Sequence, residues 1–254
     1  ITSPLNNEYL RNPIEGSVYA QSKFEAFDLI FNVGLRFDVF NPDGKILADP
    51  SDPNIINPLK PSNQFNDLNN NGVFEPQLGE TLKTVADREK YWYKDASIKY
   101  QLSPRVGLAF PISDKGVIHF SYGHFFQLPS YEFLYTNPEF ELGVGSGNVG
   151  LFGNADLKPQ KTVKGEIGIQ QQIGDDMSVD VTVFFEDFRD LTGTQSDEIS
   201  VFGGAQSYSR YANSDFGFSK GFIISFEKRF SGGLATNIDY TYSCLLYTSP
   251  SPRD

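Results

Sequence analysis

Apolar and polar residues alternate along much of the chain. In the stretch FNVGLRFDV (31–39), every second side chain is apolar, and the residues between are polar or glycine. A period of two residues is typical of a β-strand with one apolar and one polar face. The alternation recurs often enough to predict an all-β protein with about eight antiparallel strands. The stripes lie at 18–25, 31–39, 106–110, 118–122, 163–170, 179–186, 222–229 and 234–240.

The connections between these stripes alternate strictly between short and long. A soluble β-sandwich has no reason to keep every long loop on one edge, whereas outer-membrane barrels combine tight periplasmic turns with large extracellular loops. We therefore predict a fragment of an antiparallel transmembrane β-barrel, an open curved sheet whose first and last strands are unpaired edges. The long extracellular loops are expected at about 40–94, 126–160 and 188–212. Regular structure is not expected across the first, which contains Pro42, Pro50, Pro53, Pro58 and Pro61.

The charged side chains predict which face of the sheet turns to lipid. A charge on the lipid face of a barrel costs ~2–4 kcal/mol at mid-membrane, so the charged face must turn inward. The side chains expected to face lipid are Phe31, Val33, Leu35, Phe37, Val181, Val183, Ile224 and Phe226. Those expected to face the lumen are Arg36, Asp38, Glu166, Asp180 and Glu186.

Composition narrows the class of protein. The 254 residues carry 21 basic and 32 acidic side chains, a formal net charge of −11, so no basic patch could offset the repulsion of nucleic-acid phosphates. The sequence has no run of eighteen apolar residues, which excludes a membrane-spanning helix. A nucleophile elbow and a metal-ligand cluster are also missing, and His119 and His124 fall on opposite strand faces. We therefore predict that the protein is not an enzyme.

One run in the first long loop, DLNNNGVFEPQLGE (67–80), resembles a calcium-binding loop. Asp and Asn side chains stand at three alternate positions before Gly72, as the first ligands of an EF-hand loop do. The twelfth position is Leu78 rather than glutamate, so another carboxylate would have to close the site. The alternative is an Asn/Gly-rich surface turn. The candidate ligands of a structural Ca²⁺, the one cofactor considered, are Asp67, Asn69, Asn71, Val73 through its carbonyl, Glu75 and Glu80.

Three segments resemble the barrel of TonB-dependent outer-membrane receptors. They are LSPRVGLAFPISDKGVIHFSYGHFFQLPSYEFLY (102–135), NADLKPQKTVKGEIGIQ (154–170) and FEKRFSGGLATNIDYTYS (226–243). Gln160 departs from the family pattern, which has glutamate at this strand start. The segments occur in the family's order, and the resemblance runs from about Ile14 to Ser243, the C-terminal part of the barrel.

The resemblance implies a barrel of about 22 strands in the outer membrane of a Gram-negative bacterium, filled by a plug. Members of the family import scarce, large nutrients such as metal chelates, cobalamin or glycans, driven by the TonB complex. We therefore expect a wall segment of such a transporter, in contact with outer-membrane lipid. Its expected partners are a plug domain and TonB, both acting through a preceding region, and an imported ligand. The alternative is a passive porin or a surface adhesin-like barrel.

The run CLLYTSPSPRD (244–254) interrupts the alternation of the last stripe. It resembles the translation of a transposase adapter used to prepare sequencing libraries. We therefore expect residues 1–243 to be the partial barrel domain and residues 244–254 to be a non-native tail, the alternative being a genuine polar end. Pro250 and Pro252 are expected to prevent useful strand pairing in the tail.

Overall fold

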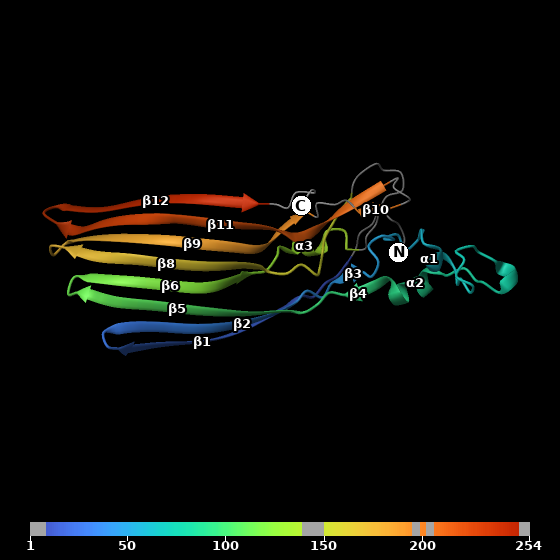
Figure 1. Cartoon of the computed structure of the whole chain (residues 1–254), viewed down its shortest axis with the longest axis horizontal. Helices are drawn as coiled ribbons and strands as arrows, with labels where there is room; N and C mark the ends of the chain where they lie inside the picture. The colour runs from blue at the N-terminus through green and yellow to red at the C-terminus, as the bar shows by residue number, and fades with distance from the viewer. Residues whose placement is uncertain (1–8, 139–149, 195–198, 202–205, 249–254) are drawn as a thin grey trace.

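Eight long strands form the body of the molecule (Figure 1). The computed structural model describes residues 9–138, 150–194, 199–201 and 206–248. The strands pair antiparallel with their neighbours along the chain, so the order in the sheet follows the order in the sequence. They are β1 (Ile14–Ala26), β2 (Leu29–Asn41), β5 (Lys99–Ser113), β6 (Gly116–Gln127), β8 (Gln160–Ile173), β9 (Met177–Thr194), β11 (Gln206–Ser231) and β12 (Leu234–Thr248).

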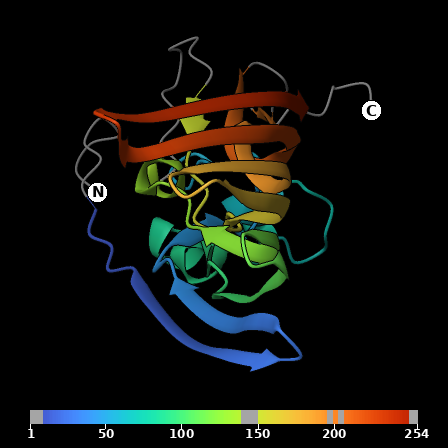
Figure 2. The ribbon, with the colours of Figure 1, turned by 90° about the vertical axis from the view of Figure 1, so that its left-hand side faces the viewer.

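The sheet is open and curved, as the sequence predicts. Among the described residues, β1 pairs with β2 alone and β12 with β11 alone, so these two strands are the edges. Figure 2 shows the long strands as an arc from β12 at the top to β1 at the bottom. The prediction of an all-β, antiparallel, open sheet of about eight long strands is therefore confirmed.

Tight turns connect the long strands at one end of the sheet. Phe27 and Asp28 join β1 to β2 with φ angles of 52° and 65°. Two consecutive left-handed residues match the right-handed twist of a hairpin. At the turn between β11 and β12, Gly232 and Gly233 have φ angles of 62° and 86° and supply the same conformation without a Cβ clash.

The other end of the sheet carries the long loops, which contain short regular elements (Figure 1). None of the helices in the described part of the chain is long and apolar enough to cross a membrane. The short elements are β3 (Lys45–Leu47), α1 (Pro61–Gln64), the 3-10 helix η1 (Pro76–Leu78), α2 (Val85–Trp92), β4 (Tyr93–Asp95), α3 (Tyr131–Tyr135), β7 (Gly150–Phe152) and β10 (Ile199–Val201).

The short elements and the lengths of β9 and β11 correct two expectations about the loops. The prolines of the first loop do not exclude regular structure, because Pro61 begins α1, where a missing N–H costs nothing, and α2 begins beyond the last of them. The third long connection is much shorter than 188–212, since β9 continues to Thr194 and β11 starts at Gln206.

The start of the tail also continues the sheet. The last strand runs to Thr248, and Cys244 pairs with Lys220 of β11. Leu245 nevertheless falls on the polar side of the ladder, opposite Ser219, so the alternation stops although the backbone pairing continues. Pro250 and Pro252 lie outside the described residues.

The buried apolar cores of the described residues lie among the loops and the strand ends nearest to them. One cluster joins residues from the first, second and third long loops with β11, and the other packs α3 and the following segment against the end of β2. We call this folded set of loops the cap. The first cluster is Leu47, Ile55, Trp92, Phe152 and Tyr208; the second is Phe40, Leu134, Tyr135, Ala155 and Leu157.

Candidate functional site

One face of the long sheet is an apolar band. Strand pairing joins the predicted stripes into continuous rows, and one row crosses all eight long strands. Leu35 is 48% exposed and Val183 is 53% exposed, so this band is not covered by other parts of the described chain. The row consists of Phe24, Phe31, Leu108, Phe120, Ile167, Val183, Phe222 and Tyr242.

The opposite face is polar and less exposed. Asp38 is 3% exposed, and Thr182 and Ser219 are each 8% exposed. A water-soluble protein buries its apolar face and exposes its polar face, so this sheet has the reverse arrangement. The five side chains expected to face the lumen, of which Arg36 is the first and Glu186 the last, lie on this polar face. The eight side chains expected to face lipid, of which Phe31 is the first and Phe226 the last, lie on the apolar face.

Ion pairs connect strands β8 and β9 on the polar face. Lys164 lies between two of the predicted carboxylates, 2.7 Å from Glu166 and 3.4 Å from Glu186. Ser121 of β6 donates a hydrogen bond of 3.0 Å to Glu166, which extends the network to a third strand. The mixed charges and hydroxyl groups suit a wetted surface.

A second group on this face surrounds Asp180. Its carboxylate accepts a hydrogen bond of 2.9 Å from the Thr182 hydroxyl and lies 3.4 Å from Nε2 of His119. Gly168 lies between the side chains of His119 and Thr182, and a Cβ at that position would lie 2.3 Å from His119 Nε2. The glycine is therefore required for His119 and Thr182 to approach each other. Arg36 and Asp38 form a separate pair, with Nε and Oδ1 2.8 Å apart.

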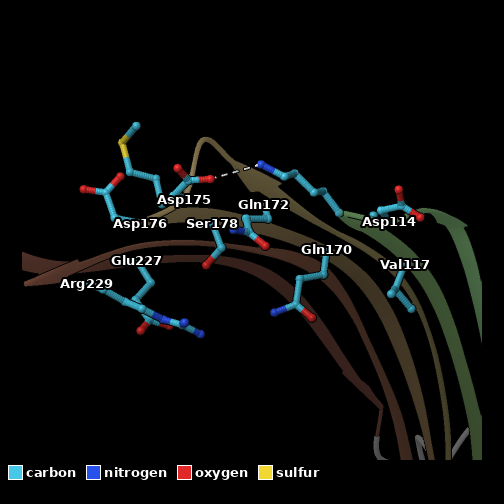
Figure 3. A pocket seen from close by; sticks show the side chains of 12 residues that line it. Asp114, Val117, Gln170, Gln172, Asp175, Asp176, Ser178, Glu227 and Arg229 are labelled. Atoms are coloured by element: carbon cyan, nitrogen blue, oxygen red, sulfur yellow. Dashed lines mark hydrogen bonds and ion pairs between the residues drawn. The ribbon is translucent and has the colours of Figure 1, made fainter. Parts of the chain in front are cut away.

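A pocket of about 270 Å³ opens on the polar face near the tight turns (Figure 3). Lys115 lies 3.3 Å from Asp175 and donates to the carbonyl oxygen of Gly174, which ties two neighbouring turns together. Lys228, near the end of β11, forms an ion pair of 3.1 Å with Asp176 in the turn before β9. Hydrogen bonds from Ser231 and Lys228 hold the pKa of the Asp176 carboxyl below its usual value. The turns are thus joined by charged side chains rather than by an apolar core.

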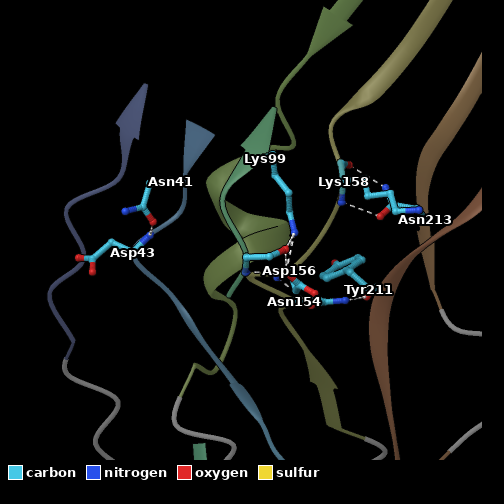
Figure 4. Close-up of polar contacts among 9 residues, drawn as sticks. Asn41, Asp43, Lys99, Asn154, Asp156, Lys158, Tyr211 and Asn213 are labelled. Carbon is cyan, nitrogen blue, oxygen red and sulfur yellow. Dashed lines mark hydrogen bonds and ion pairs between the residues drawn. The ribbon is translucent and has the colours of Figure 1, made fainter. Parts of the chain in front are cut away.

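At the end of the sheet that carries the cap, polar contacts fix the segment 154–158 to the strands (Figure 4). Asp156 accepts hydrogen bonds from Lys99 at the start of β5 and from Ser97. Lys158 and Asn213 of β11 bond reciprocally through the Lys158 backbone, at 2.7 and 2.8 Å. Burial raises the pKa of Asp156, but the hydrogen bonds from Lys99 and Ser97 outweigh it, and the pKa lies below its usual value.

Acid is expected to release this contact. Because the folded-state pKa of Asp156 lies below the ordinary 3.8, its contribution is complete above that value and is lost as the pH falls through the folded-state pKa. We expect the protection of the amides in 154–158, taken relative to the intrinsic exchange rate at the same pH, to fall below about pH 4. Asp156→Asn, which carries a neutral group at every pH, should have this lower protection already at pH 7 and show no further fall in acid. Replacement by alanine is expected to cost about 1–2 kcal/mol of local stability. An equal acid response in Asp156→Asn would assign it to other groups.

The predicted calcium ligands occupy one turn of the cap. The carboxylate of Asp67 accepts from the Gly72 N–H at 2.8 Å, and the side-chain amides of Asn69 and Asn71 both donate to Glu75 at 2.8 Å. The N–H of Val73 donates to Asn71 Oδ1. Glu80 is buried and accepts from the backbone of Leu68 and Glu75, so it closes the turn through hydrogen bonds. Within the described residues, three or more His, Cys, Asp or Glu side chains nowhere gather as metal ligands.

Calcium binding therefore stays a prediction, and protease protection tests it. If Asp67, Asn69 and Asn71 bind Ca²⁺, addition of 1 mM CaCl₂, roughly the concentration at which extracellular modules bind, should slow cleavage of 67–80. Asp67→Ala should abolish that protection. Asp43→Ala, a change in a different part of the cap, should keep it. Equal cleavage rates with calcium and with EDTA would favour the surface turn.

Comparison with known proteins identifies the family. The protein-family description "TonB dependent receptor-like, beta-barrel" matches residues 3–253. The chain belongs to the TonB-dependent receptor β-barrel family. Members are outer-membrane β-barrel receptors of Gram-negative bacteria, and they are transporters rather than enzymes. A search of curated proteins finds no significant match.

Solved TonB-dependent receptors share the fold. The FrpB iron transporter of Neisseria meningitidis (F3-3 variant) superposes with a TM-score of 0.56 at 14% identity, over 95% of this chain and 27% of that one. A mutant ferric enterobactin receptor (PfeA) of Pseudomonas aeruginosa gives 0.59 at 15% identity, over 91% and 26%. The copper transporter OprC gives 0.52 at 13%, over 94% and 29%. The chain thus spans about a quarter of the length of these receptors.

The sequence pattern does not show which polar residues of neighbouring strands meet on the polar face. Lys164 and Ser121 meet the predicted carboxylates because of strand register, and Ser103 and Arg105 lie beside Arg36 and Asp38 for the same reason. Alternation places such residues on the polar face, but the register between strands decides which of them meet.

Proposed function

We propose that this chain is a wall segment of a TonB-dependent active transporter that imports a large, scarce nutrient. The observation that carries the proposal is the reversed exposure of the sheet, with apolar Val183 open to the surroundings and Asp38, Thr182 and Ser219 sheltered. In a bilayer, the apolar band faces lipid and the polar face lines the lumen, because charge on the lipid side is costly. On this proposal Arg36, Glu166 and the other predicted carboxylates line the solute path.

The proposed solute belongs to one of three chemical classes, namely metal chelates, cobalamin and glycans. The names of the similar structures specify iron, ferric enterobactin and copper for those proteins. A metal chelate, cobalamin or a glycan is consistent with a lumen wall that alternates acidic and basic groups instead of carrying one sign of charge. The plug, the TonB complex and the imported ligand are the partners that this proposal requires.

Energy dependence separates the proposal from its alternative. The gene should be expressed with its flanking sequence in a host with TonB and in a matched host without it, and uptake of a solute panel measured in both. An active transporter loses uptake without TonB, whereas a passive porin or an adhesin-like barrel does not change. Uptake at the same rate in both hosts would contradict the proposal. Membrane insertion, assayed by heat-modifiable mobility, should be equal in the two hosts and serves as the control.

A further inference from the structure

A second pocket, of about 390 Å³, lies on the polar face close to the cap. Its walls come from β1, β2, β5 and β6. Leu128, which follows β6 and packs against the second core cluster of the cap, also lines it. On the proposed function, a solute that has entered past the cap reaches this pocket early on its path. Its polar lining residues are Glu15, Arg36, Asp38, Ser103, Arg105 and Gln127.

Two buried oxygens in the pocket wall lack partners. The side chain of Asp38 is 5% exposed, and its Oδ1 accepts from Arg36 Nε at 2.8 Å. Oδ2 of the same carboxylate and Oγ of Ser103 are buried and have no hydrogen-bond partner among the described residues. Buried polar atoms in native proteins are nearly always hydrogen-bonded, and an unpaired one is costly. These two atoms therefore indicate that the pocket wall is built to receive hydrogen bonds from a further group.

Arg105 supplies the complementary donors. Its guanidinium lies over the ring of Phe125, 4.7 Å from the centroid, and no carboxylate of the described chain pairs with it. Gly123 makes room for this arrangement, because a Cβ there would lie 3.3 Å from both Arg105 and Phe125. A stacked guanidinium is held in place and keeps its edge N–H groups for hydrogen bonding.

The charges of the lining select against ions. Glu15 and Asp38 oppose Arg36 and Arg105, so the pocket has two groups of each sign. A carboxylate or phosphate that approaches Arg105 meets two acidic groups, and an ammonium that approaches Asp38 meets two guanidinium groups. A hydroxyl group can donate to a carboxylate oxygen and accept from a guanidinium N–H at the same time.

We propose that this pocket binds a neutral, hydroxyl-rich group of the transported solute, as a sugar ring presents. One hydroxyl donates to Asp38 Oδ2, and the same or the adjacent hydroxyl accepts from Arg105, while Ser103 takes a second hydroxyl. The inference rests on the proposed function, since it needs the polar face to line the solute path. It narrows the solute class to carbohydrates or molecules that carry them.

Binding to the purified receptor tests the pocket directly. The probes are three neutral hexasaccharides (maltohexaose, mannohexaose and xylohexaose) and the hexamer of galacturonic acid, titrated by calorimetry. At least one neutral probe should bind more tightly than the acidic one. Asp38→Leu should weaken that binding roughly 10- to 150-fold, the effect of losing one charge-assisted hydrogen bond. Asp38→Asn, which keeps an acceptor oxygen, should retain part of the affinity.

The controls separate a binding defect from a folding defect. Arg105→Gln removes the second contact without creating a buried unpaired group and should also weaken binding at least tenfold. Glu227→Gln, in the pocket near the tight turns, should leave the affinity unchanged. The inference is overturned if no neutral probe binds, if the acidic hexamer binds as tightly, or if Asp38→Leu and Arg105→Gln behave like Glu227→Gln. Binding by the purified receptor requires no TonB, so these outcomes are independent of the uptake test.

Discussion

An arginine in place of Ile167 is expected to destabilise the folded barrel by about 2–4 kcal/mol, the cost of a charge on the lipid face near mid-membrane. Ile167 lies in the apolar row between Phe120 and Val183 and is 55% exposed. If this face contacts lipid, the guanidinium must either lose its hydration or deform the bilayer. The same change on a water-covered face would cost little. The folding equilibrium in lipid vesicles, measured by denaturant titration, should therefore shift roughly 30- to 1000-fold.

The matched control is Ser121→Arg. Ser121 follows Phe120 on β6, so it lies at the same height on the polar face, opposite Glu166. The new guanidinium can pair with that carboxylate, and we expect a change below about 1 kcal/mol. Ile167→Leu controls for the loss of the native side chain. If Ile167→Arg and Ser121→Arg have equal effects in vesicles, or if Ser121→Arg is the more costly, the assignment of the two faces is wrong.

Sequence pattern predicts the sheet well because its information is local. A period of two residues marks a strand and also sorts its side chains to two faces, so Val181 and Asp180 need no tertiary contact to be assigned to opposite sides. The tight turns are equally local, since residues such as Gly232 and Gly233 permit left-handed backbone. The resemblance to TonB-dependent receptors is carried by short segments at these strands and turns, and the family match confirms it.

The cap could not be predicted in this way because its cores are assembled from distant residues. Leu47, Trp92 and Tyr208 share one cluster although more than a hundred residues separate the last two. The helix α2 does have a local signal, a capping box in which Thr84 and Asp87 bond to each other's backbone. Eight residues are too few to form a stable helix alone, and the burial of Trp92 supplies what the local sequence lacks.

The same limit applies to the polar face. Alternation assigns Glu166, Asp180 and Glu186 to the polar face. A one-residue change in the register between two strands would nevertheless replace every cross-strand contact of these side chains. The pairing of Lys164 with Glu166 and Glu186, and the position of Arg105 beside Arg36, depend on register that only the three-dimensional structure supplies. The candidate sugar pocket belongs to this second level, which explains why the sequence gives no motif for it.

Replacing Asp52 with alanine is expected to open the first part of the cap. Asp52 is 1% exposed, and its carboxylate accepts hydrogen bonds from the backbone N–H groups of Leu59 and Lys60 and from the side chain of Asn63. Alanine would leave these donors unpaired in a sheltered site. At ~1–3 kcal/mol for each buried donor, the loss of the two backbone partners alone amounts to about 2–6 kcal/mol.

The loss should spread to α2, because Asn63 connects the two segments. Tyr91 donates to the Asn63 side chain at 3.2 Å, and Arg88 donates to the Asn63 carbonyl oxygen at 3.4 Å. When Asp52 no longer holds Asn63, both residues of α2 lose a fixed partner. Hydrogen exchange measured by mass spectrometry should therefore show lost protection in 52–63 and, to a smaller extent, in 85–92.

An exposed ion pair in the same loop provides the control. Lys60 forms a salt bridge with Asp49, but both side chains are more than 40% exposed, so Lys60→Met should change local stability by less than about 1 kcal/mol. Its backbone N–H still donates to Asp52, so protection in 52–63 should persist. If Asp52→Ala and Lys60→Met gave the same exchange pattern, Asp52 would not be what holds this part of the cap. The contrast follows from burial, since both residues carry one charge and only the Asp52 carboxylate is shielded from water.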